Sequence, residues 1–189
     1  EAAGLPRLRP HPVAAAAVYG LPARWYHERE IYQAERRQIF ARDWQLVGAE
    51  SDLPQPGDYV STDVAGYRFF VIRDRDGALR GFHNVCPHRA STLLEPGQGH
   101  CDLLRCRYHG LQFDCSGACV EIPGQAAIPD RARVHAYPTV ERWNLVWIWT
   151  GRPEAADPDL IPALHWLDSP DWAFSHGTIT YACNYVLLC

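Results

Sequence analysis

The sequence predicts a mainly β protein with a short helix near its start. Between residues 43 and 152 the apolar residues fall in short segments rich in aromatic and β-branched side chains, as β-strands are. Asp76-Gly77 and Ser116-Gly117 separate such segments, and an Asp-Gly pair is a strong hairpin signal. Of the 189 residues, 47% are hydrophobic and 21% are charged, which is typical of an ordinary globular protein.

The first 42 residues are predicted to form a leader and a helix. Residues 1–22 are rich in proline and alanine, and their apolar run, residues 13–21, is too short to span a bilayer. Prolines interrupt a faint likeness to a secretory signal, so a plain leader is expected. Residues 27–40, "HEREIYQAERRQIF", place charges of both signs around apolar residues. That pattern predicts a short amphipathic helix with a solvated charged face.

The strands are expected within residues 43–152, which make a domain of usual size. The Asp-Gly turn joins the third and fourth segments, the Ser-Gly turn joins the fifth and sixth, and the last two are expected to form another hairpin. The segments are "WQLVGA", "DYVSTDVAG", "YRFFVIRD", "ALRGFHNV", "LQFDC", "CVEI", "VHAYPTVE" and "NLVWIWTG".

Residues 153–189 are predicted to be a connector and the truncated start of a further domain. "GRPEAADPD" has the composition of a connector, and a short helical piece is expected around Leu160 to Leu164. The last segment, "DWAFSHGTITYACNYVLLC", begins like a strand and ends in an apolar run without a capping signal.

Charge and cysteine content restrict the partners and the compartment. The net charge of −4 gives no electrostatic reason to expect nucleic acid or a membrane surface as a partner. Seven cysteines in a chain without a secretory signal favour the reducing cytoplasm, where cysteine binds metal more often than it forms disulfides. Cys115 and Cys119 are therefore expected to be free thiols.

Two short clips of cysteine and histidine are the main chemical signal. Cys86-x-His88 and Cys106-x-x-His109 are separated by seventeen residues. The four side chains could hold one zinc ion tetrahedrally. Alternatively they could hold a two-iron, two-sulfide cluster, with the cysteines on one iron and the histidines on the other. Zinc clips usually separate their ligands by two to four residues, so the tighter first clip favours the cluster.

The clips and the sequence segments around them, "FHNVCPHR" and "CRYHGLQF", resemble the Rieske centre of Rieske non-heme iron oxygenases. The resemblance covers residues 25–189, in the N-terminal portion of the large subunit. It implies a Rieske-type antiparallel β-sandwich that holds a [2Fe-2S] cluster on Cys86, His88, Cys106 and His109. It also implies that Ile122, Pro123 and Gly124 form a third loop over the cluster, and that an α+β catalytic domain follows.

The resemblance also implies a function for the full-length protein. A ferredoxin or a flavin reductase would supply electrons to the cluster. A mononuclear Fe(II), held by two histidines and a carboxylate, would then hydroxylate or O-demethylate a small aromatic-type substrate with O2, in a homo-oligomer expected to be a trimer. No such triad with suitable spacing occurs in residues 153–189, so this chain alone is expected to be inactive. The alternative is a stand-alone electron carrier, which the helix and the 37 residues after the β domain argue against.

Four positions depart from related patterns. Respiratory Rieske proteins have a disulfide where Ser91 and Tyr108 stand, so a low midpoint potential, with fewer donors to the sulfurs, is expected. Ala90 replaces a usual glycine, and Leu111 replaces the tryptophan of many ring-hydroxylating members. "YHGLQF" and "ALHWLDSPDWAF" are more similar to vanillate-type O-demethylases, whereas residues 39–60 resemble ring-hydroxylating large subunits.

Overall fold

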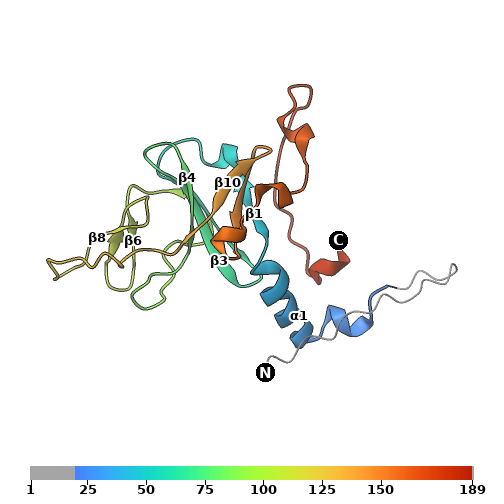
Figure 1. Cartoon of the computed structure of the whole chain (residues 1–189), viewed down its shortest axis with the longest axis horizontal. Helices are drawn as coiled ribbons and strands as arrows, with labels where there is room; N and C mark the ends of the chain where they lie inside the picture. Colours follow the sequence, from blue (N-terminus) through green and yellow to red (C-terminus); the bar gives the residue numbers. More distant parts are fainter. Residues whose placement is uncertain (1–19, 189) are drawn as a thin grey trace.

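The computed structural model describes residues 20–188, so most of the predicted leader lies outside the described residues. Three antiparallel sheets make up the body: β1-β11-β10, β5-β2-β3-β4-β9 and β6-β7-β8. Figure 1 shows β6 and β8 at one end of the molecule, and the segment that follows β11 at the other. The prediction of a mainly β protein is confirmed.

The elements follow one another in short pieces. The helices are η1 (Ala23–Tyr26), α1 (Arg29–Glu35), the π-helical turn η2 (Arg36–Phe40), and the 3-10 turns η3 (Glu50–Asp52), η4 (Pro153–Ala155), η5 (Pro158–Leu160), η6 (His165–Asp168) and η7 (Tyr185–Leu187). The strands are β1 (Trp44–Ala49), β2 (Asp58–Val64), β3 (Tyr67–Arg73), β4 (Leu79–His83), β5 (Gly97–His100), β6 (Leu104–Arg105), β7 (Gln112–Phe113), β8 (Cys119–Glu121), β9 (Ala136–Tyr137), β10 (Thr139–Arg142) and β11 (Leu145–Trp149).

Strand β3 is the centre of the core because both of its faces are covered. Successive side chains of a strand point to opposite faces of the sheet. Phe69 and Val71 pack in one cluster with side chains of β1 and β11. Phe70 and Ile72 pack in a second cluster, which contains the cysteines of both predicted clips. A single strand therefore joins the body of the protein to the end that carries the clips.

Pro138 divides a segment that the sequence predicts to be one strand. Ala136 and Tyr137 pair with β4, whereas Thr139–Arg142 pair with β11 in another sheet. Proline has no N–H to donate to a ladder, which favours the end of the first pairing there. The predicted hairpin is confirmed for β10 and β11, and the chain passes from one sheet to the other just before it.

Other expectations differ in detail from the structure. The helix predicted over residues 27–40 is confirmed as α1 and η2. The helical piece expected at Leu160 to Leu164 is misplaced, because η5 ends at Leu160 and η6 begins at His165. The strand-like start expected after residue 170 is wrong, because residues 171–184 pair with no neighbouring strand in the described part of the chain. Within residues 20–188 no helix has the length and apolar character needed to cross a membrane.

Candidate functional site

Both clips lie in loops with the same backbone frame. In the first loop (residues 86–91), the Cys86 N–H donates to the Ser91 carbonyl at 2.7 Å, and the Ala90 N–H donates to the Cys86 carbonyl at 3.0 Å. In the second loop (residues 106–111), the Cys106 N–H donates to Leu111 at 2.8 Å and the Gly110 N–H donates to Cys106 at 2.9 Å. Each cysteine therefore begins a closed turn, although the histidine follows it by two residues in one loop and three in the other.

The fourth residue after each cysteine adopts a left-handed backbone conformation. Gly110 has φ +77° and Ala90 has φ +54°. Glycine adopts this conformation without steric cost, whereas the steric cost for a residue with a Cβ atom is about 1–2 kcal/mol of free energy. The alanine that stands at a usual glycine position is thus accommodated in the frame at a cost in backbone strain.

The two loops separate the four predicted ligands into an inner and an outer pair. Cys86 and Cys106 are buried, with 1% and 2% of their surface exposed. Their neighbours in the core include Phe70, Phe82 and Phe113. His88 and His109 are exposed, and their ring centroids lie 4.7 Å apart at an angle of 63°. The structure thus buries both cysteines in one cluster and brings the two histidine rings into contact at the surface.

The surroundings of the two thiols favour one of them as a thiolate. Burial raises the pKa of Cys86, although backbone N–H groups of the first loop oppose this rise. Burial also acts to raise the pKa of Cys106, but hydrogen bonds from the N–H groups of Tyr108 and His109, from Cys86 and from the Ser91 hydroxyl outweigh it, and this pKa lies below its ordinary value of 9.0. Ser91 is one of the groups that lower this pKa, and its hydroxyl donates to the Thr92 carbonyl at 3.5 Å.

A third loop, residues 122–125, lies beside the second one. The Gln125 N–H donates to the Ile122 carbonyl at 3.1 Å, and Gly124 has φ +76°. A Cβ atom on Gly110 would lie only 3.2 Å from Cγ of Pro123. The proline ring therefore packs against the second loop, in the region where the family resemblance implies a covering loop.

The geometry fits a cluster with two irons. Within residues 20–188, no three His, Cys, Asp or Glu side chains are grouped as ligands of one metal ion. A Rieske-type cluster needs a different arrangement, with two sulfur ligands on one iron and two imidazoles on the other. The buried pair of cysteines and the exposed pair of histidines provide these two sets.

Asn84 is a supporting residue that the sequence reasoning missed. Its buried amide donates to Ser61 Oγ at 2.9 Å and to the Leu94 carbonyl at 2.7 Å. Its oxygen accepts from the N–H groups of Leu93 and Leu94 at 3.2 and 2.9 Å. These bonds tie the return of the first loop to strand β2. The sequence contained a signal for this role, since the asparagine lies two residues before Cys86 in the segment "FHNVCPHR".

The remaining cysteines and histidines lie outside the four-residue group. Cys115 and Cys119 are buried free thiols, as predicted. Burial raises the pKa of Cys101 to about 11, which makes this thiol a poor nucleophile. His100 Nδ1 lies 2.8 Å from Asp58 Oδ1, and the two residues face each other across β2 and β5. This pair fastens an edge strand.

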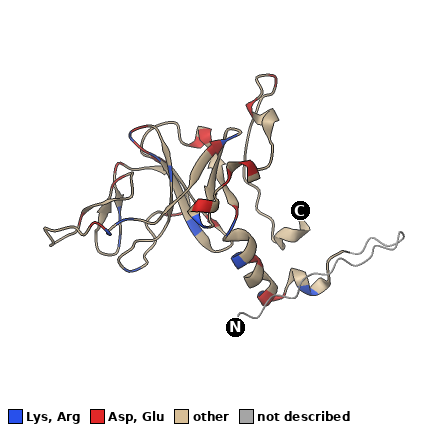
Figure 2. Ribbon diagram, viewed as in Figure 1, with Lys and Arg blue, Asp and Glu red and all other residues tan. Residues whose placement is uncertain are grey.

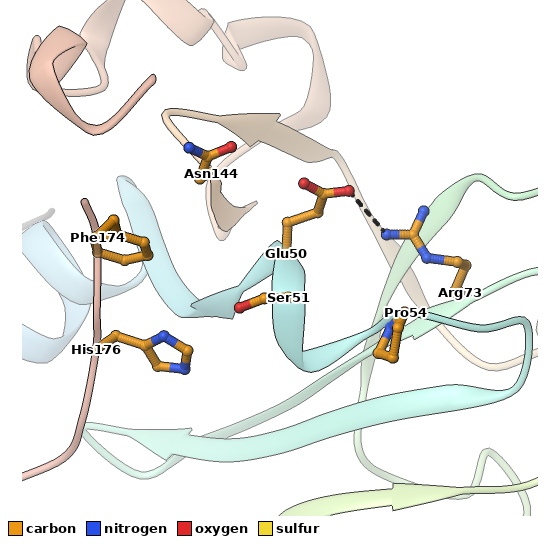
Figure 3. A pocket seen from close by; sticks show the side chains of 7 residues that line it. All are labelled: Glu50, Ser51, Pro54, Arg73, Asn144, Phe174 and His176. Atoms are coloured by element: carbon orange, nitrogen blue, oxygen red, sulfur yellow. Dashed lines mark hydrogen bonds and ion pairs between the residues drawn. The ribbon is translucent and has the colours of Figure 1, made fainter. Parts of the chain in front are cut away.

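A pocket of about 510 Å³ lies apart from the three loops. Figure 3 shows its lining side chains, among which Glu50 and Arg73 form an ion pair at 3.5 Å. His176 bonds to Asp52 at 2.9 Å. None of the four predicted ligands lines this pocket. Its charged groups thus have partners within the chain, and the loop end remains the candidate site.

One protein family matches the part of the chain that contains the three loops. The model of the Rieske [2Fe-2S] domain matches residues 43–138. The iron–sulfur subunit of a toluene-4-sulfonate monooxygenase system from Comamonas testosteroni is 42% identical over 151 residues, covering 79% of this chain and 43% of that protein. A vanillate O-demethylase oxygenase subunit from Pseudomonas sp. strain HR199 is 36% identical, covering 66% of this chain and 35% of that protein.

Solved structures lead to the same group of proteins. A quaternary ammonium Rieske monooxygenase in complex with L-carnitine superposes with a TM-score of 0.68 at 28% identity, covering 76% of this chain and 42% of that chain. Naphthalene 1,2-dioxygenase superposes with a TM-score of 0.61 at 28% identity, covering 73% and 31%. The chain spans about two fifths of the length of the curated relatives it matches.

Proposed function

Because this chain belongs to the Rieske [2Fe-2S] domain family, we propose that it is the electron-transfer portion of an oxygenase component, with a cluster on Cys86, His88, Cys106 and His109. When bound, such a cluster accepts and releases single electrons. The observation that carries the ligand assignment is the pair of equivalent loops, which bury two sulfurs and expose two imidazoles 4.7 Å apart.

The residues of the chain have separate tasks in this function. The core around Phe70, Phe82 and Phe113 excludes water from the cysteine side, and backbone N–H groups of both loops stabilise thiolate charge. The exposed imidazoles face solvent, and each can use one ring nitrogen for iron and the other for a partner or a proton. Electrons would thus enter and leave on the histidine side.

The relatives indicate an oxygenase rather than a stand-alone carrier. They are subunits of a monooxygenase system and of O-demethylases, and a dioxygenase subunit is also among them. We propose that the longer protein takes electrons from a ferredoxin or a flavin reductase and hydroxylates or O-demethylates a small aromatic-type substrate, as a homo-oligomer, expected to be a trimer. The mononuclear Fe(II) would belong to the part of these relatives with which this chain does not align. Residues 43–152 would form the Rieske domain, and residues 153–189 the connector and the start of the catalytic domain.

The test compares two chain lengths under the same conditions. Each chain, loaded with its cluster, receives a reductase, O2, Fe(II) and a panel of methoxy- and hydroxy-aromatics. The 189-residue chain should be reduced and yield no product. A chain extended by about two hundred residues, a typical domain length, should yield hydroxylated or demethylated product. Turnover by the short chain would contradict the proposed division of labour, and the absence of product from the longer chain would contradict the proposed activity.

A further inference from the structure

Two histidines outside the proposed cluster face each other across neighbouring strands. Strands β4 and β9 are antiparallel, with Phe82 opposite Ala136. The next step of this register sets His83 opposite His135, and the His83 N–H donates to the His135 carbonyl at 2.8 Å. Directly opposed residues of an antiparallel pair point to the same face of the sheet, with Cβ atoms about 4.5–5.5 Å apart. The two imidazoles therefore start from neighbouring points on one face.

Contacts with one tyrosine place both imidazole rings on this face. The ring centroid of Tyr137 lies 4.8 Å from that of His135, with the two planes at 89°. The same tyrosine ring lies 6.3 Å from the ring of His83, with the planes at 64°. Tyr137 packs in turn against the buried Phe69, with centroids 5.4 Å apart. The two histidines thus border an aromatic ring that the core holds in place.

The ring nitrogens of this pair are accessible and available as ligands. His135 is exposed and His83 is half-buried, so solvent reaches both. Within residues 20–188 neither ring has a hydrogen-bond or ion-pair partner. Burial, together with the nearby His135 and Arg68, lowers the pKa of His83 below its ordinary value of 6.5. Its imidazole is therefore neutral near pH 7, the form that offers a nitrogen lone pair to a metal ion.

The surroundings of the pair favour an ion that prefers nitrogen ligands. Residues 79–85 and 131–138 contain no aspartate or glutamate, and the acidic residues coloured red in Figure 2 belong to other segments. Carboxylates suit Mg²⁺ and Ca²⁺, whereas imidazole suits Zn²⁺, Ni²⁺ and Cu²⁺. The described part of the chain holds no group of three ligand side chains, so water would complete the coordination of an ion held by this pair.

We propose that His83 and His135 form a two-histidine site for a late first-row divalent metal ion such as Zn²⁺ or Ni²⁺. Both rings can reach one ion, because zinc–nitrogen distances are about 2.0–2.1 Å and the rings rotate about their side-chain bonds. An ion there fastens β4 to β9, an edge strand that contains two residues. It does so where β4 ends, three residues before Cys86. The site is separate from the cluster and does not depend on the proposed function.

The first test is calorimetric titration of the cluster-loaded chain, whose four predicted cluster ligands are occupied, with Ni²⁺ at about pH 7.5, where imidazole is neutral. His83→Gln and His135→Gln should each weaken binding by about tenfold or more, since each removes the gain from joining two ligands in one site. The matched controls His27→Gln and His165→Gln change exposed histidines outside the sheets and should leave the affinity unchanged. Mg²⁺ should not bind at this pair.

A second readout is the midpoint of urea unfolding with and without Ni²⁺. An ion that binds the folded chain raises this midpoint, and His135→Gln should abolish the rise. Because His135 is exposed, the variant should have the midpoint of the unchanged chain when no metal is added. The two chains have the same cysteines, so binding of Ni²⁺ to thiols of the unfolded state largely cancels in the comparison.

The outcomes separate the site from other causes of metal binding. An affinity that neither substitution changes, or that the control substitutions lower equally, would overturn the site. An affinity lost in His83→Gln and kept in His135→Gln would show a contact with one histidine and overturn the pair. Binding without a rise in the urea midpoint would overturn the link between β4 and β9. None of these results bears on the cluster, whose iron and sulfide are measured separately.

Discussion

The amide of Asn84 makes four hydrogen bonds beneath the first loop. Its side chain is fully buried, so the amide cannot form hydrogen bonds to water in the folded chain. The four bonds within the protein replace those that the amide makes with water in the unfolded chain. Cys86, two residues after Asn84, begins the first loop, and Leu93 and Leu94 follow its end at Ser91. The amide therefore ties the segment before the first loop to the segment after it.

Replacing this amide by a side chain of similar size should destabilise the fold. Asn84→Leu would leave the Leu94 carbonyl and two N–H groups buried without their partner. A loss of about 3 kcal/mol in the free energy of unfolding is expected, since each unsatisfied buried group costs about 1–3 kcal/mol. Urea unfolding provides the measurement. The exposed control Gln98→Leu should change this free energy by less than about 0.5 kcal/mol, and an equal loss in both variants would contradict the role of the amide.

A second prediction at this scale concerns His83 and pH. Burial, together with the nearby His135 and Arg68, lowers the pKa of His83 below its ordinary value of 6.5. The unfolded chain then binds a proton here at a higher pH than the folded chain does. The contribution of neutral His83 to stability is therefore present above pH 6.5 and is lost as the pH falls through the lowered pKa.

The measurement is urea unfolding at several pH values on either side of 6.5. His83→Gln removes the titrating group, so the variant should lose less stability on acidification than the unchanged chain. The exposed His27 provides the matched control, as His27→Gln. A variant as acid-sensitive as the unchanged chain would show that His83 does not contribute to this slope.

Among the elements, the hairpin of β7 and β8 requires a glycine in its turn to pack against the central sheet. Gly117 has φ +80°, and a Cβ atom there would lie 2.5 Å from Cε1 of Phe82, a buried residue of β4. The turn therefore packs directly on the central sheet, and only glycine leaves room for this approach.

Gly117→Ala should therefore cost much more stability than the same change at Gly77. Gly77 has φ +83° and no atom within 4 Å of its Cβ position. Both variants incur the backbone penalty of about 1 kcal/mol, and Gly117→Ala adds about 1–3 kcal/mol of overpacking against Phe82. Thermal or urea unfolding of the two variants gives the comparison. Similar losses at both glycines would contradict the close contact with Phe82.

The sequence predicts well those elements that are strongly patterned. Runs such as "YRFFVIRD" and "NLVWIWTG" are strands because their aromatic and β-branched residues fill the core on both sides. Strand β5, "GQGH", has no such pattern and exists because β2 offers it a free edge. For the segment after residue 170 the composition predicts a strand that the structure does not form, since these residues have no strand beside them in the described structure. Pairing partners are a tertiary property that local composition does not contain.

The candidate site divides in the same way. Spacing and residue type predict all four ligand positions, because the chemistry of such a cluster depends on those side chains. The equivalent hydrogen-bond frames of the two loops, the left-handed Ala90 and the network of Asn84 depend on backbone geometry. They could be recognised only when the loops were seen together.

For the molecule as a whole, the environment of the loops predicts the midpoint potential. Ser91 and Tyr108 occupy the positions of the respiratory disulfide, and the exposed histidine side is open to solvent. The midpoint should lie near or below zero, in the lower part of the range of about −150 to +300 mV. A redox titration followed by electron paramagnetic resonance measures it. A value near the upper limit would place the chain with the respiratory branch instead.

The cluster itself is the central claim, and metal analysis of the purified chain tests it most directly. The chain should be brown-red, with two irons and two acid-labile sulfides per molecule. His88→Ala and His109→Ala should each bleach it, because each histidine supplies half of the protein ligation of the outer iron. The matched control His100→Ala changes a histidine bonded to Asp58 and should keep the colour and the iron. A colourless chain with one zinc and no sulfide would contradict the account.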